Sequence, residues 1–191
     1  MSAPPEDQSD PDSEPPPRAT AIAGGCFYTV LLLASVVWLM LRDRIALVRT
    51  AAVGEHGAAI AVATGLGVGM LGYWTYAYGL SRVRAFAAIG TQVRQLFGSM
   101  GEAAALALVV IGAVAEEMFF RLAVQDQIGL VGSVATYALL STGAMGLRWL
   151  PVAALHATVL GSLMAQGFGL LATTTANAVM NYLVLRRMLT Q

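Results

Sequence analysis

The chain has 191 residues, of which 57% are hydrophobic and only 12% are charged. An average soluble domain carries roughly 25% charged residues, so this composition excludes an ordinary water-soluble globular protein. The formal net charge is zero and all eleven basic residues are arginine, which gives no support for nucleic acid as a partner. The single cysteine, Cys26, excludes an intrachain disulfide and a four-cysteine zinc site.

The first twenty residues differ from the rest of the chain. They contain six of the seven prolines and five of the eleven acidic residues. A segment with so little apolar surface cannot offset its conformational entropy by burial. We therefore expect residues 1–20 to form a disordered, acidic, proline-rich tail.

Residues 21–99 are predicted to hold the N-terminal membrane helices. The apolar runs at residues 21–41 and 58–80 are each about as long as a helix that crosses a bilayer, and the first fits an uncleaved anchor. The second carries small residues at four-residue spacing, which leaves one helix face open to a close neighbour; they are Gly57, Ala61, Gly65 and Gly69. Residues 82–97 place their apolar side chains on one helical face, which predicts a helix lying in the membrane surface.

Residues 100–191 are predicted to form a helical core. Further apolar spans are expected at residues 101–125, 130–147, 151–166 and 170–185. With six spans both termini share one side of the membrane, and placing them in the cytoplasm puts seven loop arginines inside and three outside. We therefore expect an all-α, multi-pass transmembrane bundle in the cell membrane, with the lipid bilayer as a partner and both termini cytoplasmic.

The third span contains Glu116, Glu117 and Arg121. Each such group in hydrocarbon costs several kcal/mol unless it is paired or hydrated, so a functional site is the default hypothesis. Glu117 and Arg121 are four residues apart in the favourable orientation for a helical ion pair, whereas Glu116 points elsewhere and suits a general base acting on water. A structural ion pair near a helix end, with Glu116 reaching water, also accounts for the pattern.

The last span contributes Asn177 and Asn181, again four residues apart on one face. Their amides could hydrogen-bond the glutamates. They could equally hold helices together, because asparagine commonly bridges helices in membranes.

The string Glu116-Glu117-Met-Phe-Phe-Arg121 inside an apolar span resembles the Glu-Glu-x-x-x-Arg motif of the CAAX-protease and bacteriocin-processing family. These proteins are intramembrane endopeptidases, and the resemblance covers roughly residues 100–187. It implies a site formed by Glu116, Glu117, Arg121, Asn177 and Asn181. It also implies a hydrophobic or prenylated peptide, or a membrane protein, as the partner.

Two histidines of that family pattern are replaced in this chain. Trp149 occupies the position of one and Asn177 that of the other, and neither side chain can accept a proton near neutral pH. His156 is the one substitute, and it would have to turn into the cavity. Glu116, Glu117 and one histidine make a poor ligand set for zinc, so no cofactor is expected and a divalent metal is only weakly supported.

Three functions are compatible with these residues. The first is a peptidase that still cleaves, with Glu116 as base and Asn177 and Asn181 stabilising the oxyanion. The second is a non-catalytic descendant that binds a membrane peptide or partner protein. The third is a small transporter component that uses Glu116 and Glu117 as a proton or cation relay.

Overall fold

The computed structural model describes residues 17–82, 90, 91, 94, 97 and 100–189. All regular elements within these residues are helical, which confirms the all-α fold. The predicted tail of residues 1–20 lies outside the described residues as far as residue 16, and residues 17–20 belong to α1 instead of to the tail. The predicted surface helix of residues 82–97 lies largely outside the described residues. The elements are α1 (Pro17–Leu41), α2 (Leu47–Thr50), α3 (Ala58–Arg82), α5 (Glu102–Glu117), η1 (Met118–Val124), α6 (Gln125–Met145), η2 (Leu147–Trp149), α7 (Leu150–Ala165) and α8 (Gly169–Leu189).

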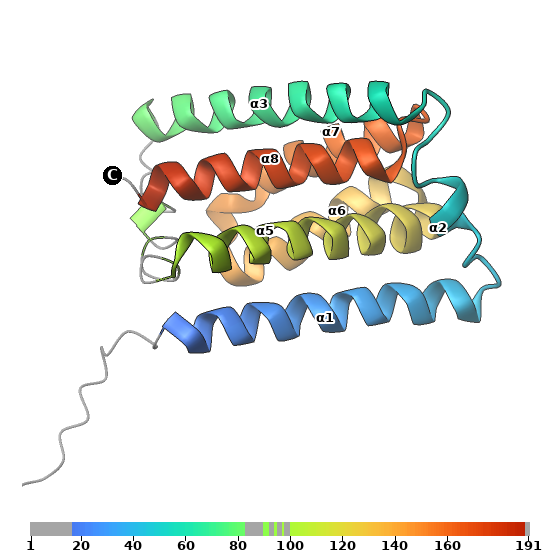
Figure 1. Cartoon of the computed structure of the whole chain (residues 1–191), viewed down its shortest axis with the longest axis horizontal. Coiled ribbons are helices and arrows are strands. Elements are labelled where there is room, and N and C mark those ends of the chain that lie inside the picture. Colours follow the sequence, from blue (N-terminus) through green and yellow to red (C-terminus); the bar gives the residue numbers. More distant parts are fainter. Residues whose placement is uncertain (1–16, 83–89, 92–93, 95–96, 98–99, 190–191) are drawn as a thin grey trace, which may run out of the picture.

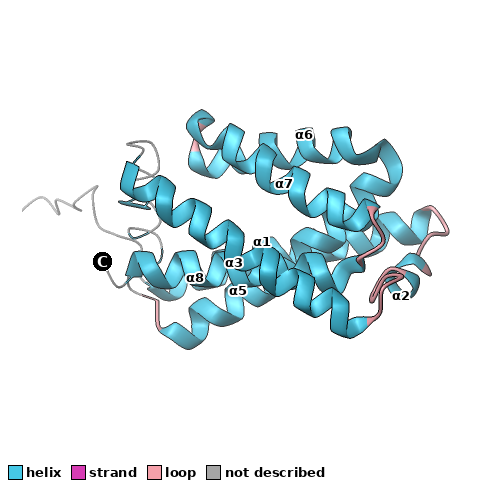
Figure 2. Ribbon diagram, turned by 90° about the horizontal axis from the view of Figure 1, so that it is seen from above, coloured by secondary structure: helices cyan, strands magenta, loops and turns pink. Residues whose placement is uncertain are grey.

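The long helices lie in two layers. In Figure 1, α1, α5, α8 and α3 lie side by side in that order, and each contacts the next. Helices α6 and α7 pack against each other and form the second layer, which contacts the first through η1 and α8 (Figure 2). Helix α1 begins and α8 ends at the same end of the bundle.

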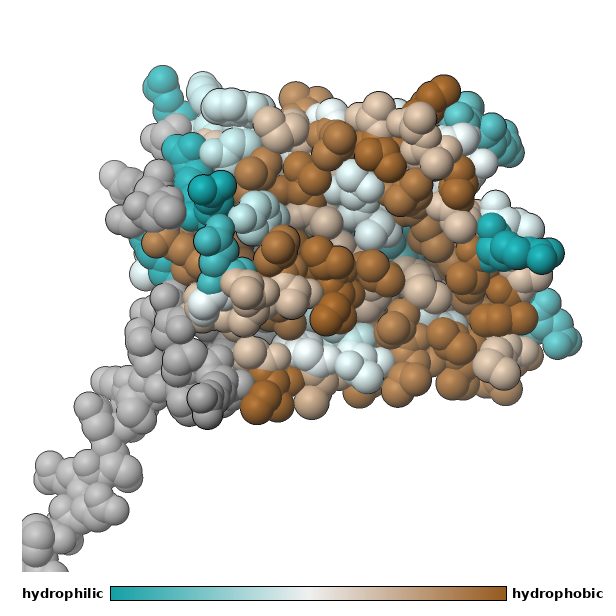
Figure 3. Space-filling model, in the orientation of Figure 1, coloured by the Kyte–Doolittle hydropathy of each residue, from teal (hydrophilic) through white to brown (hydrophobic). Residues whose placement is uncertain are grey.

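Four segments are long and apolar enough to cross a membrane, so the chain is a membrane protein. They are Ala21–Leu41, Ala58–Gly79, Glu102–Gly143 and Leu147–Ala165. The third comprises α5, η1 and most of α6. Hydrophobic side chains cover the middle of the face shown in Figure 3, and hydrophilic ones gather at both ends. The predicted six passes and the cytoplasmic position of both termini stay predictions.

Gly129 separates the third predicted span from the fourth. Its backbone has φ 73° and ψ 179° inside the segment assigned to α6, a conformation that favours glycine. The helix is therefore kinked at Gly129. This kink agrees with the gap between the predicted spans at residues 101–125 and 130–147.

Small residues of α3 allow close packing against α8. A Cβ atom on Gly65 would lie 2.6 Å from the carbonyl oxygen of Ala172, and one on Gly69 would lie 2.8 Å from that of Ala176. Ala61 is fully buried on the same helix. Gly57 was predicted to belong to this face, and that prediction is wrong, because Gly57 precedes α3 and a Cβ there meets nothing within 4 Å.

The loop between α1 and α3 is bound to the turn between α7 and α8. Glu55 donates its backbone N–H to the Gly167 carbonyl at 2.7 Å, and Leu170 donates to the Ala51 carbonyl at 2.8 Å. His56 Nε2 lies 3.1 Å from the Gln166 carbonyl oxygen. These bonds satisfy backbone groups at this end of the bundle. His56 therefore has a structural role in joining the two connections.

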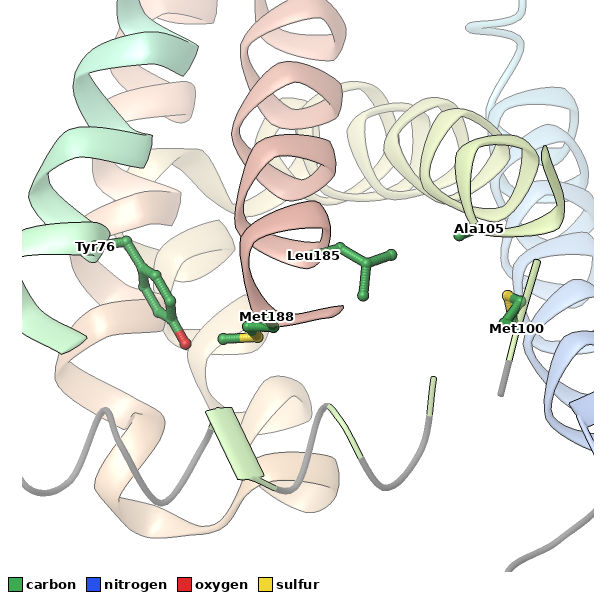
Figure 4. Packing of buried hydrophobic residues seen from close by; sticks show 5 residues of the cluster. All are labelled: Tyr76, Met100, Ala105, Leu185 and Met188. Carbon is green, nitrogen blue, oxygen red and sulfur yellow. The ribbon is translucent and has the colours of Figure 1, made fainter. Parts of the chain in front are cut away.

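A cluster of buried side chains lies at the opposite end of the bundle, where α3 and α8 end and α5 begins (Figure 4). Tyr76 of α3 points toward Met188 of α8, and Leu185 of α8 points toward Ala105 at the start of α5. Met100 lies beside Ala105. The cluster joins α3, α5 and α8 next to the cavity described below.

Replacing Gly69 with valine is expected to destabilise the bundle. The added side chain would meet the backbone of α8, and overpacking of this kind costs about 1–3 kcal/mol. Thermal unfolding in detergent should show a lowered Tm for Gly69→Val. Gly67→Val is the matched control, because a Cβ at Gly67 meets nothing within 4 Å; an equal loss in both variants would contradict the packing argument.

Candidate functional site

The helix that carries the two glutamates widens directly after them. Helix α5 ends at Glu117, and Met118–Val124 form a π-helix, η1. Single π-helical turns inside α-helices occur frequently at functional sites. In this turn Arg121 remains buried, with 2% of its surface exposed.

Arg121 and Glu117 form a fully buried ion pair. The Arg121 Nε donates to Glu117 Oε2 at 3.1 Å, and both side chains are 0% exposed. Arg121 Nη1 donates to Ser133 Oγ at 3.1 Å, and Ser133 in turn donates to the Phe120 carbonyl at 2.8 Å. The ion pair expected from the four-residue spacing is therefore present, and α6 supplies a hydroxyl that supports it.

Asn177 of α8 joins the two carboxylates. Its Nδ2 donates to Glu116 Oε2 at 3.0 Å and to Glu117 Oε1 at 3.2 Å. Asn181 Nδ2 donates to Asn177 Oδ1 at 2.7 Å. The sequence left open whether these amides bind the glutamates or hold helices together, and one set of contacts between α5 and α8 does both.

Glu116 differs from Glu117 in its surroundings. It is partly exposed and lines a cavity of about 540 Å³ between α1, α5, α6 and α8. Trp149 and Asn181 line the same cavity, as does Tyr137 of α6. Of the two glutamates, only Glu116 belongs to the cavity wall.

Tyr28 of α1 covers Glu116 from the side. A Cβ on Gly112 would lie 2.7 Å from the Tyr28 ring, so the glycine one turn before Glu116 makes room for it. The Tyr28 hydroxyl lies close enough to the Glu116 carboxylate to interact with it. This contact was missed by sequence reasoning, and the only signal for it was a glycine four residues before a glutamate on one helix face.

His156 is not among the described residues that line the cavity. Its ring lies beside Asn177 and has its centroid 5.9 Å from that of Tyr137. Its Nε2 atom is buried without a hydrogen-bond partner among the described residues. His156 thus lies behind Asn177, away from the cavity wall formed by Glu116.

Trp149 lies on the cavity wall, with its ring centroid 6.1 Å from that of Tyr76. Within the described ranges, no three His, Cys, Asp or Glu side chains form a group that could hold a metal ion. Thr173, which sequence reasoning placed only in a polar run, is fully buried and contacts the Glu117 carboxylate. Its position one turn before Asn177 on the same face was the signal that could have found it.

Comparisons with protein-family models, curated proteins and solved structures give no match to this chain. The candidate site therefore rests on its own geometry. It consists of the buried pair of Glu117 and Arg121, the bridging amide of Asn177, and Glu116 on the cavity wall with Asn181 beside it.

Removing only one member of the buried ion pair is expected to be strongly destabilising. Arg121→Met leaves the Glu117 carboxylate buried without its partner, which costs about 3–5 kcal/mol. The double variant Glu117→Gln with Arg121→Met removes both charges and should lose less stability than Arg121→Met alone. Chemical unfolding in detergent would measure the difference, and a double variant no more stable than the single one would contradict the uncompensated-charge argument.

Proposed function

We propose that this chain is an integral membrane protein that binds an apolar, peptide-like or prenyl-like ligand in the cavity beside Glu116 without cleaving it. The protein is built on the plan of the CAAX-type intramembrane endopeptidases, which its Glu116-Glu117-Met-Phe-Phe-Arg121 string resembles. The observation that carries the proposal is the set of partners around Glu116.

Peptide hydrolysis needs a base, a donor for the oxyanion and a proton donor for the leaving amine. Glu116 is suited to the first role. Asn177 has two N–H groups on Nδ2, and that atom bonds both carboxylates. It therefore has no N–H left for an oxyanion, and only Asn181 has an amide proton free of the bonds described above.

Trp149 supports the same conclusion. It lies on the cavity wall where the family pattern has a histidine. An indole N–H can donate a hydrogen bond but cannot take up or pass on a proton. Among the described residues that line the cavity, Glu116 therefore has no histidine beside it to share the proton transfers.

The cavity suits an apolar ligand. Its volume of about 540 Å³ lies within the range of about 300–1,000 Å³ for small-molecule sites. Aliphatic side chains such as Leu108, Val109 and Val184 form part of the wall. Few polar groups interrupt them, and Glu116 and Asn181 are two that could fix the orientation of a ligand.

A farnesylated peptide is expected to bind the purified protein in detergent or nanodiscs, and mass spectrometry should show it intact after prolonged incubation. Val184→Trp fills the cavity and should weaken binding by roughly tenfold, which corresponds to 1.4 kcal/mol. Leu33→Trp is the matched control, because Leu33 is 59% exposed on α1 and should face lipid.

Two results would contradict the proposal. Peptide cleavage that Glu116→Gln abolishes would show that the protein is an active peptidase. Binding that Val184→Trp leaves unchanged would show that the ligand does not use this cavity.

A further inference from the structure

Among the described residues, no cationic side chain forms an ion pair with Glu116, the carboxylate on the cavity wall. The site holds the carboxylates of Glu116 and Glu117 and the guanidinium of Arg121, and the guanidinium is bonded to Glu117. Glu116 is the one formally charged side chain among the described residues that line the cavity. With both glutamates ionised, the site thus carries one excess negative charge, and it lies on the cavity wall.

Within the described part of the chain, the side chains that offer hydrogen bonds to Glu116 are neutral. Asn177 donates an amide N–H at 3.0 Å and Tyr28 provides a phenol hydroxyl. Hydrogen bonds stabilise a carboxylate but leave its charge in place. In an apolar site within a membrane an unpaired charge is unfavourable, so a positive charge placed in the cavity offsets part of this cost on binding.

The walls of the cavity are rich in aromatic rings. Seven of the lining side chains are Phe, Tyr or Trp. Around Glu116 they include Tyr28 and Tyr137, and the Tyr137 ring packs edge-on against Phe120 with 4.8 Å between centroids. Aromatic faces attract organic cations, and desolvation strengthens this attraction.

We propose that the ligand of this cavity is a hydrophobic organic cation whose positive charge binds against Glu116 among the aromatic side chains. This inference rests on the proposed function, because it names the class of ligand that the same cavity takes. The carboxylate supplies the charge attraction, the aromatic rings supply cation–π contacts, and the aliphatic wall holds an apolar chain.

A matched pair of ligands tests the charge alone. One is a farnesyl chain that ends in trimethylammonium, and the other is the neutral compound in which carbon replaces the nitrogen. Binding of each to the full chain in a maltoside detergent is measured by calorimetry. The cation should bind roughly tenfold or more tightly than the neutral compound.

Glu116→Gln should remove this preference, because the amide keeps the shape of the side chain without its charge. Glu102→Gln is the control that should keep it, since Glu102 accepts a hydrogen bond from Tyr182 and does not line this cavity. Thermal unfolding of each variant shows whether it remains folded.

Equal binding of the two compounds by the unaltered protein would overturn the cation inference and leave the proposed function standing. A preference that survives Glu116→Gln would also overturn it. If neither compound binds and the farnesylated peptide does not bind either, the proposed function itself is contradicted.

Discussion

The buried ion pair between Glu117 and Arg121 is the interaction on which the rest of the site depends. Both side chains are fully buried, in a segment apolar enough to cross a membrane. Two charges in that position are costly unless hydrogen bonds from within the protein compensate them. Ser133 of α6 bonds Arg121 Nη1 and Asn177 of α8 bonds Glu117, while Arg121 Nη2 has no hydrogen-bond partner among the described residues. The ion pair thus connects three segments of the bundle.

Two adjacent glutamates acquire different properties because they face different neighbours. Glu117 points to Arg121, Thr173 and Asn177, and its charge is balanced inside the protein. Glu116 shares Asn177 but otherwise meets Tyr28 and the cavity. Glu117 is therefore held by contacts within the protein, whereas Glu116 is available to a ligand.

Features set by spacing along one helix could be predicted from the sequence. The spacing of Glu117 and Arg121 predicted their ion pair, and the glycines at 65 and 69 predicted close packing of α3. The bond from Asn177 to the glutamates was one of two alternatives that the sequence left open, and other contacts between helices far apart in the chain could not be predicted. Tyr28 reaches Glu116, and Ser133 reaches Arg121, only because of how the helices pack and rotate. The same packing determines that Trp149 lines the cavity while His156 does not.

The position of α8 has a consequence for how the protein is made. Helix α8 is the last helix of the described chain, yet it lies between α5 and α3 and carries Asn177. Synthesis proceeds from the N-terminus, so Glu116 and Glu117 emerge from the ribosome some sixty residues before the amide that binds both of them. Until α8 enters, α3 and α5 lack the helix that separates them and the two carboxylates lack their shared donor. Completion of the site therefore waits for the synthesis of α8, and a product that ends before this helix would leave Glu116 and Glu117 without their shared hydrogen-bond donor.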